Sequence, residues 1–354
     1  MTDVGYNITK FDQPGYFTTL RIFGCIEIPV NLFGLYCIIY ASPKSMTRYY
    51  KILLAKYQIL VTFLDTLMTH LMCPVAFIPY LVVYTDGIFH HFFGLHGAIQ
   101  VEIWLYVLHG VTISILELFE YRFQASKLNN LKITKRRIIL TILFNFIGMN
   151  SALYTLSYYP RDQEHAKEEI AKLWKTPADV LFDNRTVAMD VCRLCRLHWG
   201  MLLGTIIATM VCSTLFTLSV RNLLKNKNTV SKSTLRTQKL FLIVLCCQIL
   251  IPIFLIVVPA LLLYTRSEFS QTLNNAGAIA LSNHGLTGTL IMLTTNKYYR
   301  QFIVSKIPIT ISWKKPNTNM VNIANSSIGG LVAKPTVENA IFSNRNPGSP
   351  SRRA

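Results

Sequence analysis

Apolar residues along the 354-residue chain gather into seven long runs, separated by shorter polar stretches. The run at 240–264, for example, contains no charged residue. A helix needs about 20 residues to cross roughly 30 Å of hydrocarbon, and each run reaches that length. Helix is the expected state because backbone polar groups in lipid must be satisfied within the segment. The predicted spans cover residues 18–40, 56–84, 98–120, 138–159, 199–220, 240–264 and 276–296.

Basic residues are distributed unevenly over the loops between these runs. The loops 41–51, 122–137 and 221–239 contain lysines and arginines but no acid. Together with residues 297–354 they hold 24 of the chain's 35 basic residues, whereas loop 160–198 balances seven basic with seven acidic residues. Because cytoplasmic loops carry an excess of Lys and Arg, the N-terminus is expected outside the cell and the C-terminus in the cytoplasm.

Composition favours a membrane protein over a soluble enzyme. Hydrophobic residues make up 51% of the chain and charged residues 15%, against about 25% charged in a typical soluble domain. The net charge of +18 reflects the basic inner loops, so no nucleic-acid partner is expected. We predict an all-α membrane protein, a seven-transmembrane helix bundle. Its parts are an extracellular N-terminus (1–17), the bundle (18–296), a juxtamembrane amphipathic helix (297–312) and a disordered cytoplasmic tail (313–354).

A stripe of polar residues runs along the third span. Glu102, Tyr106, His109, Glu117 and Glu120 lie within about 60° of one line at 100° per residue. Charged groups inside a membrane are costly and face the bundle interior. The stripe either only holds helices together or divides by depth. In the second case the first three residues bind a ligand in the outer half and the last two form a switch at the cytoplasmic end.

Further polar residues lie inside other spans: Glu27, Asn31, Asp65, His70, Gln248, Asn283 and His284. Asp65 falls near the middle of its span, where a buried carboxylate needs a partner. Asn31 and Asn283 are candidate partners, and a bound sodium ion is an alternative. We group Asn31, Asp65 and His284 as a buried polar network. The candidate ligand site takes in four more residues, Tyr80, Tyr84, Gln248 and Asn283, although the tyrosines also fit an interfacial aromatic belt.

No combination of residues indicates an enzyme, a cofactor or a metal site. The pair His90-His91 stands in an outer loop without further ligands at metal spacing. Two glycosylation patterns, at Asn7 and Asn184, fall on the side predicted to be extracellular.

Four motifs follow one another in a characteristic order. Residues 28–46 have the sequence IPVNLFGLYCIIYASPKSM and end in a Pro-Lys-x-Met loop. Asp65 is then followed by Pro74 and Pro79. Residues 118–123 have the sequence LFEYRF, and residues 283–302 have the sequence NHGLTGTLIMLTTNKYYRQF.

In this order and spacing the motifs resemble one family, the nematode serpentine chemoreceptors. The resemblance is strongest to the class H group (Srh), with the class I group (Sri) as a close relative, and covers residues 20 to 303. Tyr121 stands where the family's Phe-Glu-Asn-Arg motif has Asn, and Tyr298 stands where its last motif has Pro.

The resemblance implies a chemosensory G-protein-coupled receptor without a cofactor. A small organic ligand would bind in the outer half of the bundle, and a heterotrimeric G protein would be activated at the cytoplasmic face. The receptor would be a multi-pass protein of the plasma membrane, in the cilia of sensory neurons. The coupling residues would be Glu117, Glu120, Arg122, Tyr299 and Arg300. Glu120 and Arg122 are two positions apart, about 200° around a helix, so both glutamates are expected to pair with basic residues on other helices.

The third span lacks the cysteine that commonly forms a disulfide with the second outer loop of such receptors. Cys192 and Cys195 could pair with each other, or one of them could pair with Cys25 or Cys73.

Three other functions stay open. An inverted seven-helix ligand-gated channel requires the N-terminus inside the cell. A proton-coupled carrier would use Glu102, His109 and Glu117 as a relay. A receptor homologue that has lost signalling is the third alternative.

Overall fold

The computed structural model describes residues 13–43, 46–77, 82–127, 135–150, 159–174, 178–189, 194–226 and 271–306, with six further positions between 153 and 250. All of them belong to one compact unit, residues 1–307. The elements in chain order are α1 (Pro14–Tyr40), α2 (Arg48–Thr66), the π-helical turn η1 (Leu67–Leu71), β1 (Pro74–Phe77), β2 (Val82–Thr85), α3 (Ile88–Phe93), α4 (Gly97–Ser126), α5 (Lys135–Asn150), α6 (Gln163–Trp174), α7 (Ala178–Leu181), β3 (Thr186–Ala188), α8 (Leu194–Lys225), α11 (Gln271–Ser282), α12 (His284–Thr295) and α13 (Lys297–Lys306).

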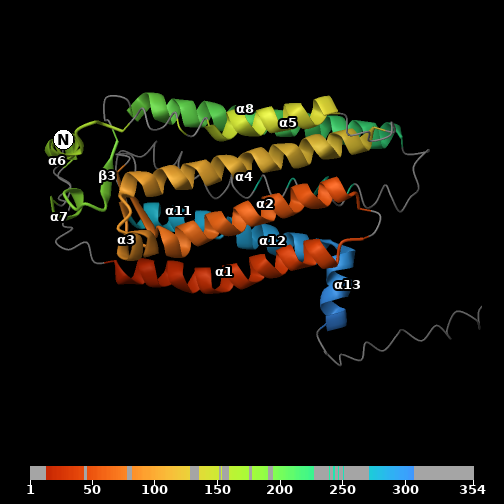
Figure 1. The fold of residues 1–354 in the computed structure, drawn as a ribbon, viewed down its shortest axis with the longest axis horizontal. Coiled ribbons are helices and arrows are strands. Elements are labelled where there is room, and N and C mark those ends of the chain that lie inside the picture. Colours follow the sequence, from red (N-terminus) through yellow and green to blue (C-terminus); the bar gives the residue numbers. More distant parts are fainter. Residues whose placement is uncertain are drawn as a thin grey trace, which may run out of the picture. The chain divides into compact units, whose positions relative to one another are not determined.

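The long helices of this unit lie side by side (Figure 1). α2 packs between α1 and α4, α4 packs on α5 and α8, and α12 packs on α1 and α2. Within the described ranges, four segments are long and apolar enough to cross a membrane: α1, α2 with η1, α4, and Ile206–Lys225 of α8. The described helices overlap six of the seven predicted spans, and the predicted span 240–264 falls almost entirely outside the described residues.

Local sequence signals set the ends of several helices. Pro14 occupies the first position of α1, where its missing N–H costs nothing. The hydroxyl of Thr47 accepts a hydrogen bond from the backbone N–H of Tyr50 at 3.4 Å and caps the start of α2. Gly94 ends α3 with a φ of 59°, a left-handed conformation that favours glycine.

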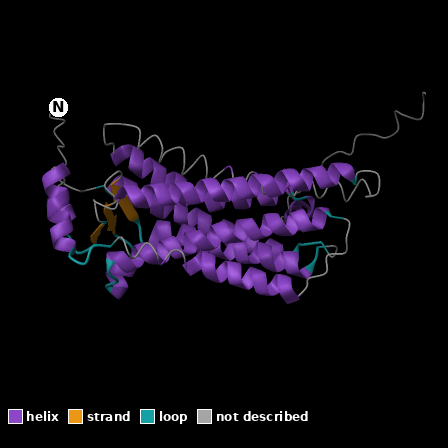
Figure 2. Cartoon of the chain, turned by 90° about the horizontal axis from the view of Figure 1, so that it is seen from above, coloured by secondary structure: helices purple, strands orange, loops and turns teal. Residues whose placement is uncertain are grey.

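The prediction of one helix over 56–84 is wrong in its last third. Helical structure ends at Leu71, Cys73 takes a φ of 44°, and Pro74 begins strand β1. Proline lacks the N–H that a helix needs and disfavours helical geometry in the residue before it, so the chain leaves the helix here. β1, β2 and β3 form an antiparallel sheet in that order. The described fold is therefore mostly helical but not all-α. The sheet lies at one end of the helices (Figure 2).

The sheet joins two segments that are far apart in the sequence. β2 precedes α4 and β3 precedes α8, with Val82 opposite Ala188 and Tyr84 opposite Thr186. We call β1, β2, β3, α6 and α7 the strand cap. Its buried apolar residues, together with the start of α1, are Tyr16, Leu20, Val75, Phe77, Val82, Tyr84, Ala166, Ile170, Val180, Leu181 and Ala188.

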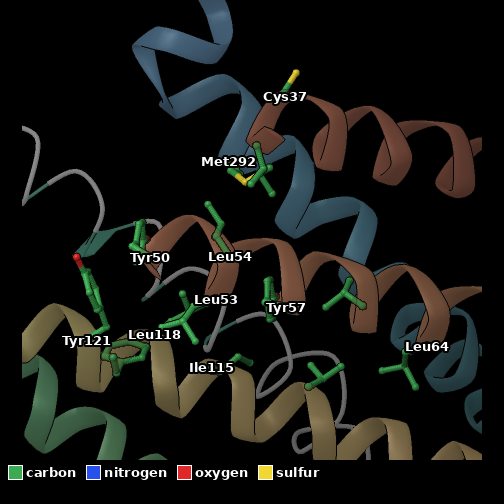
Figure 3. Packing of buried hydrophobic residues seen from close by; sticks show 14 of the residues in the cluster. Cys37, Tyr50, Leu53, Leu54, Tyr57, Leu64, Ile115, Leu118, Tyr121 and Met292 are labelled. Carbon is green, nitrogen blue, oxygen red and sulfur yellow. The ribbon is translucent and has the colours of Figure 1, made fainter. Parts of the chain in front are cut away.

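The main core lies between α1, α2, α4 and α12. Figure 3 shows Leu53 of α2 directed toward Leu118 of α4, with Met292 of α12 on the other side of α2. α2 is therefore the central helix of the described bundle, because it contributes apolar contacts in both directions.

Among the described residues, no cysteine forms a disulfide. Cys25 and Cys73 are free thiols, and the Cys73 thiol donates a hydrogen bond to the carbonyl of Thr69 at 3.1 Å. The predicted pairings with these two residues are therefore not formed. Cys192 and the side chain of Cys195 lie outside the described part of the chain.

Arg185 links the residue that follows β2 to the turn that precedes β3 through charge-assisted hydrogen bonds. Its guanidinium donates to both carboxylate oxygens of Asp183, at 2.6–3.1 Å, and to Asp86 at 2.8 Å, 99 positions away. It also lies over the ring of Tyr84, 4.7 Å from the centroid. Asp86 has a second contact, with His91 at 3.0 Å. The hydrogen bonds from Arg185 hold the pKa of Asp183 below its usual range.

We expect Arg185→Ala to destabilise the strand cap by on the order of 1–3 kcal/mol, because two partly buried carboxylates lose charge-assisted hydrogen bonds. Hydrogen exchange of β2 and β3 measures this loss, with the exposed Arg161→Ala as control. The stabilisation should disappear as the pH falls through the lowered pKa of Asp183 and its carboxylate becomes protonated. Equal exchange rates in the two variants would contradict the role of Arg185.

Candidate functional site

Polar side chains meet inside the bundle where α1, α2 and α12 pack together. Asp65 of α2 is 1% exposed and accepts a hydrogen bond from the amide of Asn31 at 2.8 Å. The ring nitrogen Nδ1 of His284 lies 3.4 Å from the other carboxylate oxygen of Asp65. The structure thus brings together the three residues grouped from the sequence, with His284 rather than Asn283 as the partner from α12.

Gln58 and Thr289 complete this buried polar network. Thr289 donates to the side-chain oxygen of Asn31 at 2.6 Å, and Gln58 donates to Thr289 at 2.8 Å. Neither residue was expected from the sequence to belong to the network. The spacing contained a signal for Gln58, which lies seven residues, or about two helical turns, before Asp65 on the same face. Five side chains therefore fix the relative positions of three helices.

The seventh predicted span is divided at this network. α11 ends at Ser282 and α12 begins at His284, so the predicted helix 276–296 is two helices. Gly285, in the first turn of α12, lies directly against the side chain of Asp65. A Cβ atom on Gly285 would lie 2.0 Å from the Asp65 carboxylate. This close approach therefore requires glycine.

The candidate ligand residues do not form one cluster in the described structure. Tyr80 and Gln248 lie outside the described residues. Tyr84 is buried in the strand cap beneath Arg185, and the amide of Asn283 donates to the carbonyl of Ile279 in its own helix at 2.8 Å.

Burial along the predicted stripe of α4 is uneven. Glu102 and His109 are partly buried, but Tyr106 is exposed. The Nδ1 atom of His109 hydrogen-bonds the carbonyl of Leu105, 2.8 Å away in the same helix. The expectation that the whole stripe faces the interior is therefore wrong at Tyr106. Apolar neighbours join this half of α4 to the strand cap: Met72, Val101, Leu105 and Met189.

Glu117 pairs with a basic residue of another helix, as the sequence predicts. Its carboxylate, 7% exposed, lies 2.8 Å from the ammonium group of Lys56 in α2. Asn145 of α5 accepts from Lys56 and donates to the other oxygen of Glu117. We call these residues the Lys56 triad, which joins α2, α4 and α5.

Arg122, near the C-terminal end of α4, stacks on an aromatic side chain. Its guanidinium carbon lies 3.8 Å from the ring centroid of Tyr50, a cation–π geometry. The Tyr50 and Tyr121 rings are stacked with centroids 4.9 Å apart. Tyr299 of α13 is fully buried nearby, with its hydroxyl 3.1 Å from that of Ser42.

The remaining predicted residues have different environments. Glu120 is partly buried and Arg300 is exposed. Asn184 is exposed in the turn between α7 and β3, whereas Asn7 lies outside the described residues.

Comparison with known proteins identifies one family. Residues 12–309 match the family described as "Serpentine type 7TM GPCR chemoreceptor Srh". The Caenorhabditis elegans protein named serpentine receptor class H-72 is 24% identical to this chain over 293 residues, which cover 80% of this chain and 83% of that protein. The matched region includes all the described residues, and the resemblance based on the four motifs is confirmed.

For the Lys56 triad we expect Lys56→Met to lower the free energy of unfolding by roughly 2–4 kcal/mol, because it leaves the carboxylate of Glu117 buried without its cation. Adding Glu117→Gln should recover part of this loss, since a neutral amide remains beside Asn145. Thermal unfolding of the purified variants measures both effects, with the exposed Lys225→Met as control. A double variant less stable than Lys56→Met alone would contradict this account.

Proposed function

Because the chain belongs to the Srh family of serpentine seven-transmembrane chemoreceptors, we propose that it binds a small organic molecule and activates a heterotrimeric G protein. The family is one of receptors rather than enzymes, and the chain is a multi-pass membrane protein. The observation that carries the proposal is the continuous 30-residue helix α4. It runs from Glu102, beside the strand cap, to Arg122, which stacks on Tyr50 at the opposite end.

The proposed ligand contacts lie in the half of α4 next to the strand cap. Glu102, Tyr106 and His109 supply hydrogen-bonding groups there, and the partly buried Trp104 supplies apolar surface. Tyr80, Gln248 and Asn283 remain proposed contacts from other segments. A site of this mixed chemistry suits a small organic molecule with an apolar body and one or two polar groups.

The proposed coupling site lies at the other end of α4. The basic loops 122–137 and 221–239, with Arg300 of α13, would face the C-terminal helix of a Gα subunit. A ligand changes the receptor only through its different affinity for two arrangements. The proposed difference is the position of Arg122, stacked on Tyr50 in one arrangement and released toward the G protein in the other.

This proposal requires the N-terminus outside the plasma membrane, with the sensory cilium as the compartment that the family implies. Glycosylation tests the orientation. Asn184→Gln is expected to remove a glycosidase-sensitive shift in gel mobility, because this exposed residue lies in the predicted extracellular loop. Asn325, in the sequence Asn325-Ser326-Ser327, is a third acceptor pattern and lies on the predicted cytoplasmic side, so Asn325→Gln is the control. A shift lost only in Asn325→Gln would reverse the orientation and favour the inverted channel.

For the coupling site we expect Tyr50→Leu to raise ligand-independent G-protein activation, because Arg122 loses its stacking partner. A cation–π contact of about 1–2 kcal/mol corresponds to a roughly 5- to 30-fold shift of the equilibrium. Ligand-independent activation in Tyr50→Phe should stay near the wild-type level, because the aromatic ring is kept. In the double variant Tyr50→Leu with Arg122→Ala it should fall back to the wild-type baseline.

The measurement is G-protein dissociation in living cells at matched surface expression. Phe123→Leu is the matched control, because it removes an aromatic ring of α4 that lies under Lys127 rather than Arg122. Activity in Tyr50→Leu that persists when Arg122 is replaced would remove Arg122 from the mechanism.

A further inference from the structure

Glu27 of α1 has no role in the contacts described so far. It shares the buried face of α1 with Gly24 and Asn31, and its side chain is fully buried. Neither of its carboxylate oxygens has a hydrogen-bonding partner in the described part of the chain. A carboxylate at such a position is either neutral or compensated by a cation.

The ionisable groups around Glu27 come from every helix packed on this face. α2 contributes Asp65, η1 contributes His70, α12 contributes His284, and α1 itself contributes Arg21. Asp65 lies close enough to interact electrostatically with Glu27. Gly24 lies one helical turn before Glu27, and the ring of His70 packs against it. A Cβ atom on Gly24 would lie 2.4 Å from the Nε2 atom of His70. Arg21 is exposed.

The polar groups next to Asp65 are already engaged with it. Asp65 accepts a hydrogen bond from the amide of Asn31 and lies in contact with the imidazole of His284. If both Glu27 and Asp65 were ionised, Glu27 would be a buried charge beside a second carboxylate, without a hydrogen-bonding partner among the described residues. Two neighbouring carboxylates in such a site do not both ionise, and the one with fewer hydrogen bonds takes up a proton. That residue is Glu27.

A proton needs fewer partners at this location than a metal ion does. Among the described residues, no group of three or more His, Cys, Asp or Glu side chains could hold a metal ion. A hard cation such as sodium or calcium needs several oxygen ligands, whereas a proton needs only the carboxylate itself.

We propose that Glu27 is a proton-binding site of this receptor. The carboxyl group is protonated in the arrangement seen here, and it releases the proton to water when α1 separates from α2 and α12. Acid therefore favours the packed arrangement, and a rise in pH favours the separated one. The consequence for signalling rests on the proposed receptor function, but the proton site itself does not.

Infrared spectroscopy of the protein in lipid nanodiscs tests protonation directly. At neutral pH the wild type should show the C=O stretching band of a protonated carboxyl group, and Glu27→Gln should lose it without a change of side-chain shape. Glu168→Gln, in an exposed position on α6, is the control and should keep the band. An unchanged band in Glu27→Gln would overturn the proposal.

Thermal unfolding as a function of pH is the second measurement. A proton held in the folded state stabilises at low pH, and this stabilisation is lost as the pH rises and Glu27 ionises. The unfolding temperature of the wild type should fall over that range, and that of Glu27→Gln should not. The same measurement in sodium chloride and in choline chloride tests the alternative. If sodium chloride stabilises the wild type more than choline chloride does, and this difference disappears in Glu27→Gln, the site binds sodium and the proposal is overturned.

Signalling separates this inference from the proposed function. For one proton, the equilibrium between the two arrangements changes at most tenfold per pH unit. Ligand-independent signalling should rise toward that limit with pH in the wild type and stay constant in Glu27→Gln. The infrared band and the unfolding results can hold while neither the wild type nor Glu27→Gln activates a G protein at any pH. In that case the proposed function fails and the proton site stands.

Discussion

The hydrogen bonds of the Asp65 carboxylate determine how α1, α2 and α12 meet. Inside a membrane, water does not solvate a buried charge, so each polar group must find its partner within the protein. Asp65 accepts a hydrogen bond from the amide of Asn31, lies 3.4 Å from the ring of His284 and contacts Gly285 closely. The division of the seventh predicted span follows from the same interaction, because the interruption at Asn283 creates the helix N-terminus at which the carboxylate lies.

The two ends of α4 are held in different ways. Near the strand cap its neighbours are apolar, and the sheet and Arg185 hold the flanking segments. Toward the other end, the Lys56 triad and the stacking of Arg122 on Tyr50 tie α4 to α2. Both contacts are polar or electrostatic and lie next to a tightly packed apolar core.

Hydrophobic length predicted where most of the described helices lie, although it missed the ends of the spans 56–84 and 276–296. The rule that a buried carboxylate needs a partner pointed from Asp65 to Asn31, whereas the partner at the start of α12 is His284 rather than Asn283. The strands were not predictable in the same way, because the apolar run 74–85 fits a helix or a buried strand equally well. Cys73 and Pro74 decide between the two through backbone geometry. The partners of Glu117 and Arg122 depend on which helices are neighbours, which periodicity within one helix does not reveal. Lys56 and Tyr50 therefore emerged only from the structure.

Gly285 also limits how this chain and its relatives can diverge. Its α-carbon lies so close to the Asp65 carboxylate that no side chain fits between them. A larger residue at position 285 is compatible with the fold only if position 65 carries a shorter side chain. Val61 limits the same space, because its Cγ1 atom would lie 2.4 Å from a Cβ atom at position 285. Which residues fit at position 285 therefore depends on positions 61 and 65 together, so the three positions are coupled through packing alone.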